Sequence, residues 1–152
     1  RIPCVKTADD FWKFVTAGRE LGHLHVNYED VEPYPVIFKK GNPKQTEISN
    51  PEKFYYVTEM KFAGNSKEKN KSTVIYNSNI TITDISLESV MGRQCVKTDK
   101  KSGIVNDANH YAVETIGNPA YPLELFQRVI TVSLETMKIV KNLPKLEIRE
   151  TK

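Results

Sequence analysis

The chain has no run of about 20 apolar residues, the length that a membrane-spanning helix requires. Its N-terminus also lacks the pattern of a signal peptide. Only two cysteines occur in 152 residues, Cys4 and Cys95, so at most one disulfide could form between them. A lone possible bridge without a secretory segment favours reduced thiols and a cytoplasmic location. These absences argue against a membrane protein and against a small secreted domain held together by disulfides.

Motifs of catalysis and metal binding are missing as well. The sequence contains no Gly-rich phosphate loop with its Lys-Ser or Lys-Thr, no Gly-x-Gly-x-x-Gly, no helical His-Glu-x-x-His and no cysteine pairs for zinc. His23 and His25 are two residues apart and would point to different faces of a helix, so they cannot bind one metal together. Asp99 and Asp107 could bind a metal ion only if the fold brought them together. The residues therefore indicate no catalytic group, cofactor or metal in this chain, and an independent enzyme is the least favoured class.

The length and composition fit one globular domain. A chain of 152 residues can bury roughly 68–70% of the surface that it exposes when unfolded, so neither metal nor disulfides are required. The 22 basic and 19 acidic residues give a net charge of +3. The isoelectric point near 8.8 is below the value of about 9 that many nucleic-acid-binding domains exceed. The chain starts without methionine, and we expect residues 1–152 to be a single domain excised from a larger protein.

Two segments have the apolar spacing of helices. Phe11, Phe14, Val15 and Leu21 predict a helix at about 8–24, which Thr7 can cap. A longer segment predicts a helix at about 122–142. Pro122 suits its first turn, and its apolar stripe, expected to face the core, comprises Leu123, Phe126, Ile130, Leu134, Met137 and Val140.

The middle of the chain has the pattern of antiparallel strands. After Pro33 and Pro35 an extended piece is expected at Val36 to Lys39, followed by a loop in which Asn50-Pro51 forms a turn. Phe54 to Phe62 is rich in aromatic and β-branched residues and predicts a strand. Beyond a polar tip at 64–71, strands are expected at 73–76 and 79–85 about an Asn77-Ser78 turn. These elements predict an α+β fold: an antiparallel sheet from the middle of the chain, packed by an N-terminal helix and a long C-terminal helix.

The segment Arg93 to Tyr111, RQCVKTDKKSGIVNDANHY, is predicted to be a polar loop. A short helix at 86–93 would lead into it. Ile104 and Val105 are expected to anchor the loop in a core, and so to hold its polar groups on a surface. Its cations, hydroxyls and amides can bond phosphates or base edges, although a solvated connection has the same composition.

Three long segments carry a resemblance to a known family: Phe11 to Glu29, Arg93 to Asn109, and Asn118 to Pro144. Together and in this order they resemble the C-terminal specificity domain of type ISP restriction-modification enzymes. The chain departs from the family near Leu87-Glu88-Ser89, where relatives usually have an extra stretch, and this places the expected helix at 86–93 in doubt.

The resemblance implies a fragment of a single polypeptide in which nuclease, helicase-like motor and adenine methyltransferase domains precede a target recognition domain. ATP, Mg²⁺ and S-adenosylmethionine would then serve those other domains. The implied partners are double-stranded DNA and the methyltransferase and motor domains of the same chain.

The resemblance also divides the candidate contacts into two sets. Because members of the family read different sequences, the shared loop suits phosphate positioning or interdomain docking, through Lys97, Lys100, Lys101, Ser102, Asn106 and Asn109. Base reading would fall to the strand region and its loops, where the candidates are Lys39, Lys40, Lys44, Gln45, Asn65, Lys67, Asn70 and Lys71.

Two functions remain open at this point. The first is a DNA sequence-reading module, which should present a positive groove lined by polar side chains. The second is an interdomain scaffold that couples methyltransferase to motor without base contacts, which should present an apolar patch.

Overall fold

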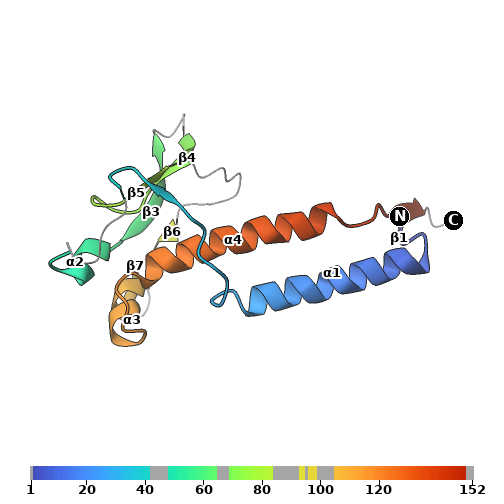
Figure 1. Cartoon of the computed structure of the whole chain (residues 1–152), viewed down its shortest axis with the longest axis horizontal. Coiled ribbons are helices and arrows are strands. Elements are labelled where there is room, and N and C mark those ends of the chain that lie inside the picture. The colour runs from blue at the N-terminus through green and yellow to red at the C-terminus, as the bar shows by residue number, and fades with distance from the viewer. Residues whose placement is uncertain are drawn as a thin grey trace. The chain divides into compact units, whose positions relative to one another are not determined.

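A computed structural model describes residues 2–41, 48–64, 69–83, 93–94, 96–98 and 105–149 of the chain (Figure 1). The elements are β1 (Ile2–Cys4), α1 (Ala8–Val26), β2 (Ile37–Phe38), α2 (Pro51–Tyr55), β3 (Glu59–Gly64), β4 (Lys69–Ile75), β5 (Thr81–Thr83), β6 (Arg93–Gln94), β7 (Val96–Thr98), β8 (Val105–Asp107), α3 (Ala108–Glu114), α4 (Tyr121–Lys141) and β9 (Glu147–Arg149). An N-terminal helix, a central antiparallel sheet and a long C-terminal helix confirm the predicted α+β class. Within the described residues, no helix is long and apolar enough to cross a membrane.

The contacts divide the chain into two compact units. Unit 1 comprises residues 1–32 and 131–152, and unit 2 comprises residues 33–130. Helix α4 contributes its first half to unit 2 and its second half to unit 1.

Unit 1 contains α1, the second half of α4, and a two-stranded sheet of β1 and β9 (Figure 1). The Thr7 hydroxyl accepts a hydrogen bond from the Asp10 amide at 3.1 Å, which confirms the predicted cap of α1. At the other end of the helix, the His25 ring is 2.9 Å from the Thr136 hydroxyl. The pairing of β1 with β9 was not predicted, since three residues are too few to show a period.

The apolar stripe predicted for the helices is only partly buried. Ile130 is fully buried, but Met137 is 50% exposed and Val140 is 43% exposed. On α1, Phe11 is 49% exposed, and Ala17 is the buried residue of that helix. The prediction that Met137 and Val140 face a core was therefore wrong. Both lie in a helix, as their spacing predicted, but about half of each side chain stays exposed.

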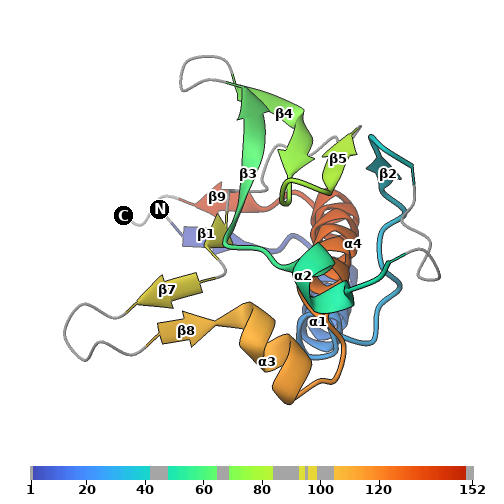
Figure 2. The ribbon, with the colours of Figure 1, turned by 90° about the vertical axis from the view of Figure 1, so that its left-hand side faces the viewer.

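Unit 2 is built on a five-stranded antiparallel sheet with the order β2-β5-β4-β3-β6 (Figure 2). Directly opposite residues on neighbouring strands point to the same face of the sheet, so Val74 and its partner Ile82 are buried together. The buried core of unit 2 also includes Tyr55, Val57, Met60, Tyr76, Ile80, Ala112, Ala120, Leu123, Phe126 and Ile130.

The strand predicted at 54–62 begins later than expected. Residues 51–55 form helix α2, and β3 starts only at Glu59. The reason is Asn50, whose side chain accepts a hydrogen bond from the Lys53 amide at 2.9 Å and so caps a helix with Pro51 at its start. Asn50-Pro51 is therefore a helix start, and the aromatic residues that follow it are not all in a strand.

The segment predicted as one polar loop is largely regular. Strands β7 and β8 form an antiparallel hairpin that leads into α3 (Figure 2). Val105 is 57% exposed on β8, so the prediction that it anchors a core was wrong. Ile104 lies outside the described residues, as does the predicted helix at 86–93 except for Arg93, which is in β6.

Candidate functional site

The four predicted base-reading residues that the structure describes fall at opposite ends of the sheet. Lys39 and Lys40 follow β2 and are exposed, and the Lys39 amide donates to the Thr81 carbonyl at 2.9 Å. Asn70 and Lys71 lie at the start of β4, next to the β3–β4 hairpin tip, whereas Thr81 follows the turn at the other end of β4. The strands therefore do not bring the backbones of these four described residues together. Lys44, Gln45, Asn65 and Lys67 lie outside the described residues.

Two of the predicted phosphate contacts, Lys97 and Asn106, lie on the paired strands β7 and β8. Lys97 on β7 is the direct partner of Asn106 on β8, which is exposed, so the strands bring these two residues together. Lys100, Lys101 and Ser102 belong to the hairpin's connection and lie outside the described residues.

Asn109 has a different role from the one predicted. It is only 8% exposed, and its amide bridges the Val57 backbone: Oδ1 accepts from the Val57 amide at 2.9 Å and Nδ2 donates to the Val57 carbonyl at 2.8 Å. Nδ2 also donates to Asp107 Oδ1 at 2.8 Å. Because these bonds use the amide inside unit 2, they argue against Asn109 as a phosphate contact, and we treat it as a structural residue.

Asp107 is likewise used by the fold. Its Oδ1 accepts hydrogen bonds from the backbone amides of Asn109 at 2.8 Å and His110 at 3.4 Å. These bonds cap the start of α3. Asp99 lies outside the described residues. No cluster of metal-ligating side chains occurs among the residues that the structure describes.

A polar hollow of about 460 Å³ lies between α2 and the turn that joins β4 to β5. Its lining residues are Asn50, Glu52, Lys53, Tyr56, Asn77, Ser78 and Asn79. The Tyr56 ring is 45% exposed, and Lys40 reaches the rim, where its Nζ donates to the Ser78 carbonyl at 3.4 Å. Sequence reasoning missed this hollow because it assigned Asn50-Pro51 and Asn77-Ser78 only to turns. The capping pattern Asn-Pro-x-x could have revealed the helix.

Asn77 fixes the two walls of the hollow to each other. Its Nδ2 donates to the Phe54 and Tyr56 carbonyls at 2.9 and 3.0 Å. Its Oδ1 accepts from the Asn79 and Ile80 amides, both at 2.8 Å. The side chain is thus saturated, and the exposed groups around it are held on a rigid frame.

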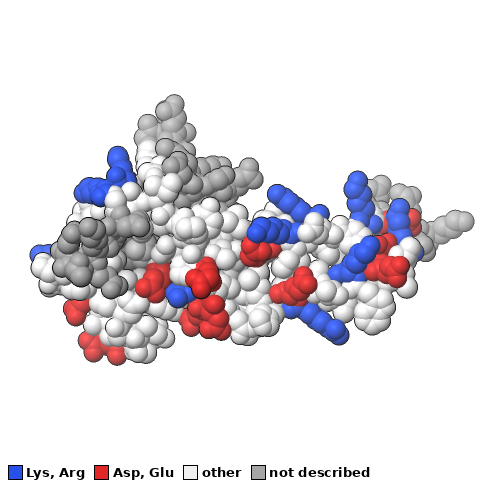
Figure 3. All heavy atoms as spheres, viewed as in Figure 1, with Lys and Arg blue, Asp and Glu red and all other residues white. Residues whose placement is uncertain are grey.

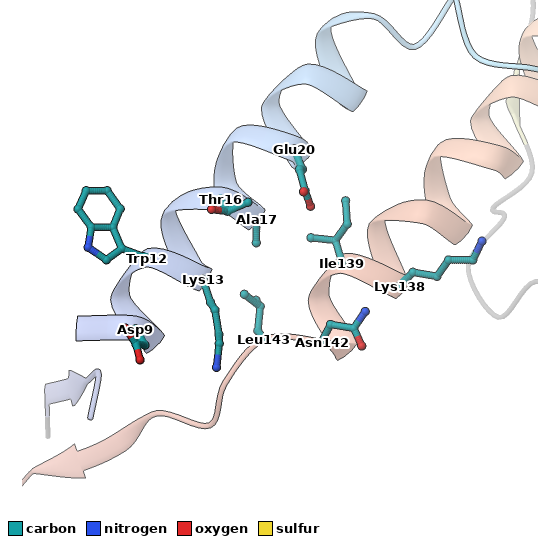
Figure 4. A pocket seen from close by; sticks show the side chains of 10 residues that line it. All are labelled: Asp9, Trp12, Lys13, Thr16, Ala17, Glu20, Lys138, Ile139, Asn142 and Leu143. Atoms are coloured by element: carbon teal, nitrogen blue, oxygen red, sulfur yellow. The ribbon is translucent and has the colours of Figure 1, made fainter. Parts of the chain in front are cut away.

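Unit 1 carries a second pocket, of about 460 Å³, between α1 and the end of α4. Figure 4 shows Ala17, Ile139 and Leu143 directed toward the space between the helices, whereas the Trp12 indole points away from it. Trp12 is 59% exposed and forms an edge-to-face pair with Phe11 at 5.5 Å.

Charges of both signs cover the helices of unit 1. Figure 3 shows Lys and Arg side chains interleaved with Asp and Glu side chains over α1 and the second half of α4. Each helix contains an ion pair between residues three apart. In α1, Lys13 Nζ is 3.5 Å from Asp10 Oδ1, and in α4, Lys138 Nζ is 2.6 Å from Glu135 Oε1. This face therefore has no extended positive region to attract an anionic partner.

Comparison with known families decides the identity. The family described as the Type ISP C-terminal specificity domain matches residues 1–125, which is most of the chain. The chain belongs to this family. The match spans the whole five-stranded sheet of unit 2 and continues into the first turn of α4. No curated protein matches the chain.

Two solved Type ISP enzymes resemble this specificity domain. The first is a nuclease-deletion mutant of the restriction-modification enzyme LlaGI in complex with a DNA substrate mimic, with 37% identity and a TM-score of 0.66 over 99% of this chain. The second is the ATP-dependent enzyme LlaBIII bound to DNA, with 33% identity and a TM-score of 0.67 over 98% of this chain. The chain spans 14% and 10% of these two enzymes.

Proposed function

We propose that this chain recognises a DNA target sequence on behalf of a Type ISP restriction-modification enzyme. One observation carries the proposal: nearly the whole chain matches a part of two Type ISP enzymes, one in complex with a DNA substrate mimic and the other bound to DNA. The chain also belongs to the Type ISP specificity-domain family. Exposed Lys39, Lys40 and Asn106 of unit 2 are surface groups of the kind that such recognition uses.

The proposal extends to the protein that carries the chain. Residues 1–152 would be a single domain at the C-terminal end of a longer enzyme. ATP, Mg²⁺ and S-adenosylmethionine would serve motor, nuclease and adenine methyltransferase domains elsewhere in that polypeptide. This domain would place the target DNA for methylation, translocation and cleavage by those domains.

The two sets of predicted contacts divide the work. Lys97, Lys100, Lys101, Ser102 and Asn106 would position phosphates or dock against a neighbouring domain. The base-reading set would supply donors and acceptors to the major groove: Lys39, Lys40, Lys44, Gln45, Asn65, Lys67, Asn70 and Lys71. Lys39 and the start of β4 lie at opposite ends of the sheet, so variants in each region are tested separately.

Binding titrations test this division in the intact protein. Replacing Lys97, Lys100 and Lys101 by alanine should weaken target and random DNA alike and lower the salt slope by about one unit for each lost phosphate contact. Replacing a base-reading residue should cost about 1–3 kcal/mol on the target and much less on random DNA. The division fails if the lysine variants change the ratio of the two affinities and every base-set variant leaves it unchanged.

The scaffold function remains a second candidate because of unit 1. Exposed Phe11, Trp12, Met137 and Val140 lie on its helices, and apolar side chains are typical of contacts with another domain. Footprinting the intact protein with and without this domain separates the functions. A reader should lose the footprint with the domain, whereas a scaffold should keep it and lose only coupled activity.

A further inference from the structure

The polar hollow in unit 2 contains chemistry that the predicted contact sets leave out. Its described groups that can donate hydrogen bonds to an outside molecule are the Lys53 ammonium, the Tyr56 and Ser78 hydroxyls, and the Asn50 and Asn79 amides. Inside the unit, Asn50 Oδ1 accepts from the Lys53 amide and Asn79 Nδ2 donates to the Phe54 carbonyl. Ammonium, hydroxyl and amide groups are the ones that bind phosphate and sugar oxygens in protein–DNA complexes.

The charge of the hollow favours an anion. Lys53 and Glu52 line the hollow, and the Lys40 ammonium lies at its rim, so two ammonium groups stand against one carboxylate in the charge of this region. Among the residues that the structure describes, the Lys53 ammonium has no ion-pair partner. Its charge is therefore available to an outside ligand.

The frame of the hollow is rigid enough to position these groups. Two hydrogen bonds from Asn77 Nδ2 connect the β4–β5 turn to the end of α2, and two bonds to Asn77 Oδ1 hold the turn itself. The Asn50 cap holds the start of α2. A preorganised concave site loses little freedom when a ligand enters it. Its shape suits a group that protrudes from the ligand, as the phosphates of a duplex do, whereas base edges lie inside a groove and are reached by protruding elements.

We propose that the polar hollow binds a phosphodiester of the DNA backbone, with Lys53, Tyr56, Ser78 and Asn79 as its contacts and Lys40 at its rim. This inference rests on the proposed function, and it gives unit 2 a second phosphate contact, at a distance in sequence from the β7–β8 hairpin. The contact is independent of base sequence. It fixes the register of the duplex on the domain while other residues read the bases.

Binding titrations of the intact protein at several salt concentrations test the inference. The probes are a duplex that the protein selects from a random pool and a scrambled duplex of the same composition. Lys53→Gln should weaken binding to both duplexes by about two- to tenfold, the equivalent of one hydrogen bond, and should lower the salt slope by about one unit. Tyr56→Phe should weaken both in the same direction without changing the slope. Glu52→Gln should strengthen both, because it removes a repelling carboxylate.

Lys145→Gln is the matched control, since it makes the same change of charge at an exposed position in unit 1. The inference is overturned if Lys53→Gln has no more effect than this control, or if it changes the preference for the selected duplex. Circular dichroism of each variant must match the wild type. If the wild-type protein selects no sequence but Lys53→Gln still weakens binding, the recognition function fails and the phosphate contact stands.

Discussion

Asn106 and Asn109 have the same side chain and are three residues apart, but the fold exposes the first and buries the second. Asn106 is exposed on β8, whereas Asn109 is buried and bonded to both backbone groups of Val57. The sequence could place both in a polar segment, but burial depends on what packs against the segment from elsewhere in the chain. For the same reason the sequence could not reveal that Asn77 Nδ2 donates to the Phe54 and Tyr56 carbonyls at the end of α2.

Asn109→Ala should lower the free energy of unfolding by about 1–3 kcal/mol, because it leaves buried backbone groups of Val57 without partners. Asn106→Ala should change it by about 0.5 kcal/mol or less. Chemical denaturation of the two variants measures the difference. Equal stabilities would show that the Asn109 bridge contributes nothing.

Burial raises the pKa of the Tyr55 hydroxyl above its ordinary value of 10.0, and the nearby Glu124 carboxylate raises it further. The unfolded chain therefore releases this proton first. The contribution of Tyr55 to stability is fully present below pH 10 and is lost as the pH rises through the folded pKa.

The variant Tyr55→Phe has no hydroxyl to titrate, so the loss of stability that Tyr55 causes at high pH should disappear. Denaturation curves at neutral pH and above pH 10 should show a smaller decrease of stability in the variant than in the wild type. Parallel decreases would contradict the assignment of the shift to burial of this hydroxyl.

At the scale of elements, the two long helices could be predicted to within two residues at each end. Their apolar period extends over several turns, and Thr7 and Pro122 mark their starts. Helix α2 could not be recognised because five residues contain little more than one turn, and the aromatic residues that follow Pro51 also favour strands. The β1–β9 pair and the β7–β8 hairpin consist of three-residue strands, which are too short to show alternation.

Side chains in the first half of helix α4 should contribute more to the stability of the domain than those in its second half. Ile130→Ala removes a fully buried side chain of unit 2 and should cost about 2–5 kcal/mol of stability. Met137→Ala removes a half-exposed side chain and should cost about 1 kcal/mol or less. Thermal unfolding followed by circular dichroism compares them, and a larger loss for Met137→Ala would place the core elsewhere along the helix.

At the scale of the whole molecule, composition revealed little about function, since a net charge of +3 is close to neutral. The information lay in three long segments that resemble one family, and the match over residues 1–125 confirmed it. Which surface meets DNA could not be predicted in the same way. The hollow is formed by two segments more than 20 residues apart, Asn50 to Tyr56 and Asn77 to Asn79, whose proximity only the fold creates.

The central claim is that this domain determines which DNA sequence the enzyme recognises. The most direct measurement exchanges residues 1–125 in the intact protein for the matching part of LlaBIII and identifies the preferred duplex by selection from a random pool. The account predicts that the exchanged protein selects the sequence that LlaBIII selects in the same assay. Selection of the original sequence by the exchanged protein would contradict it.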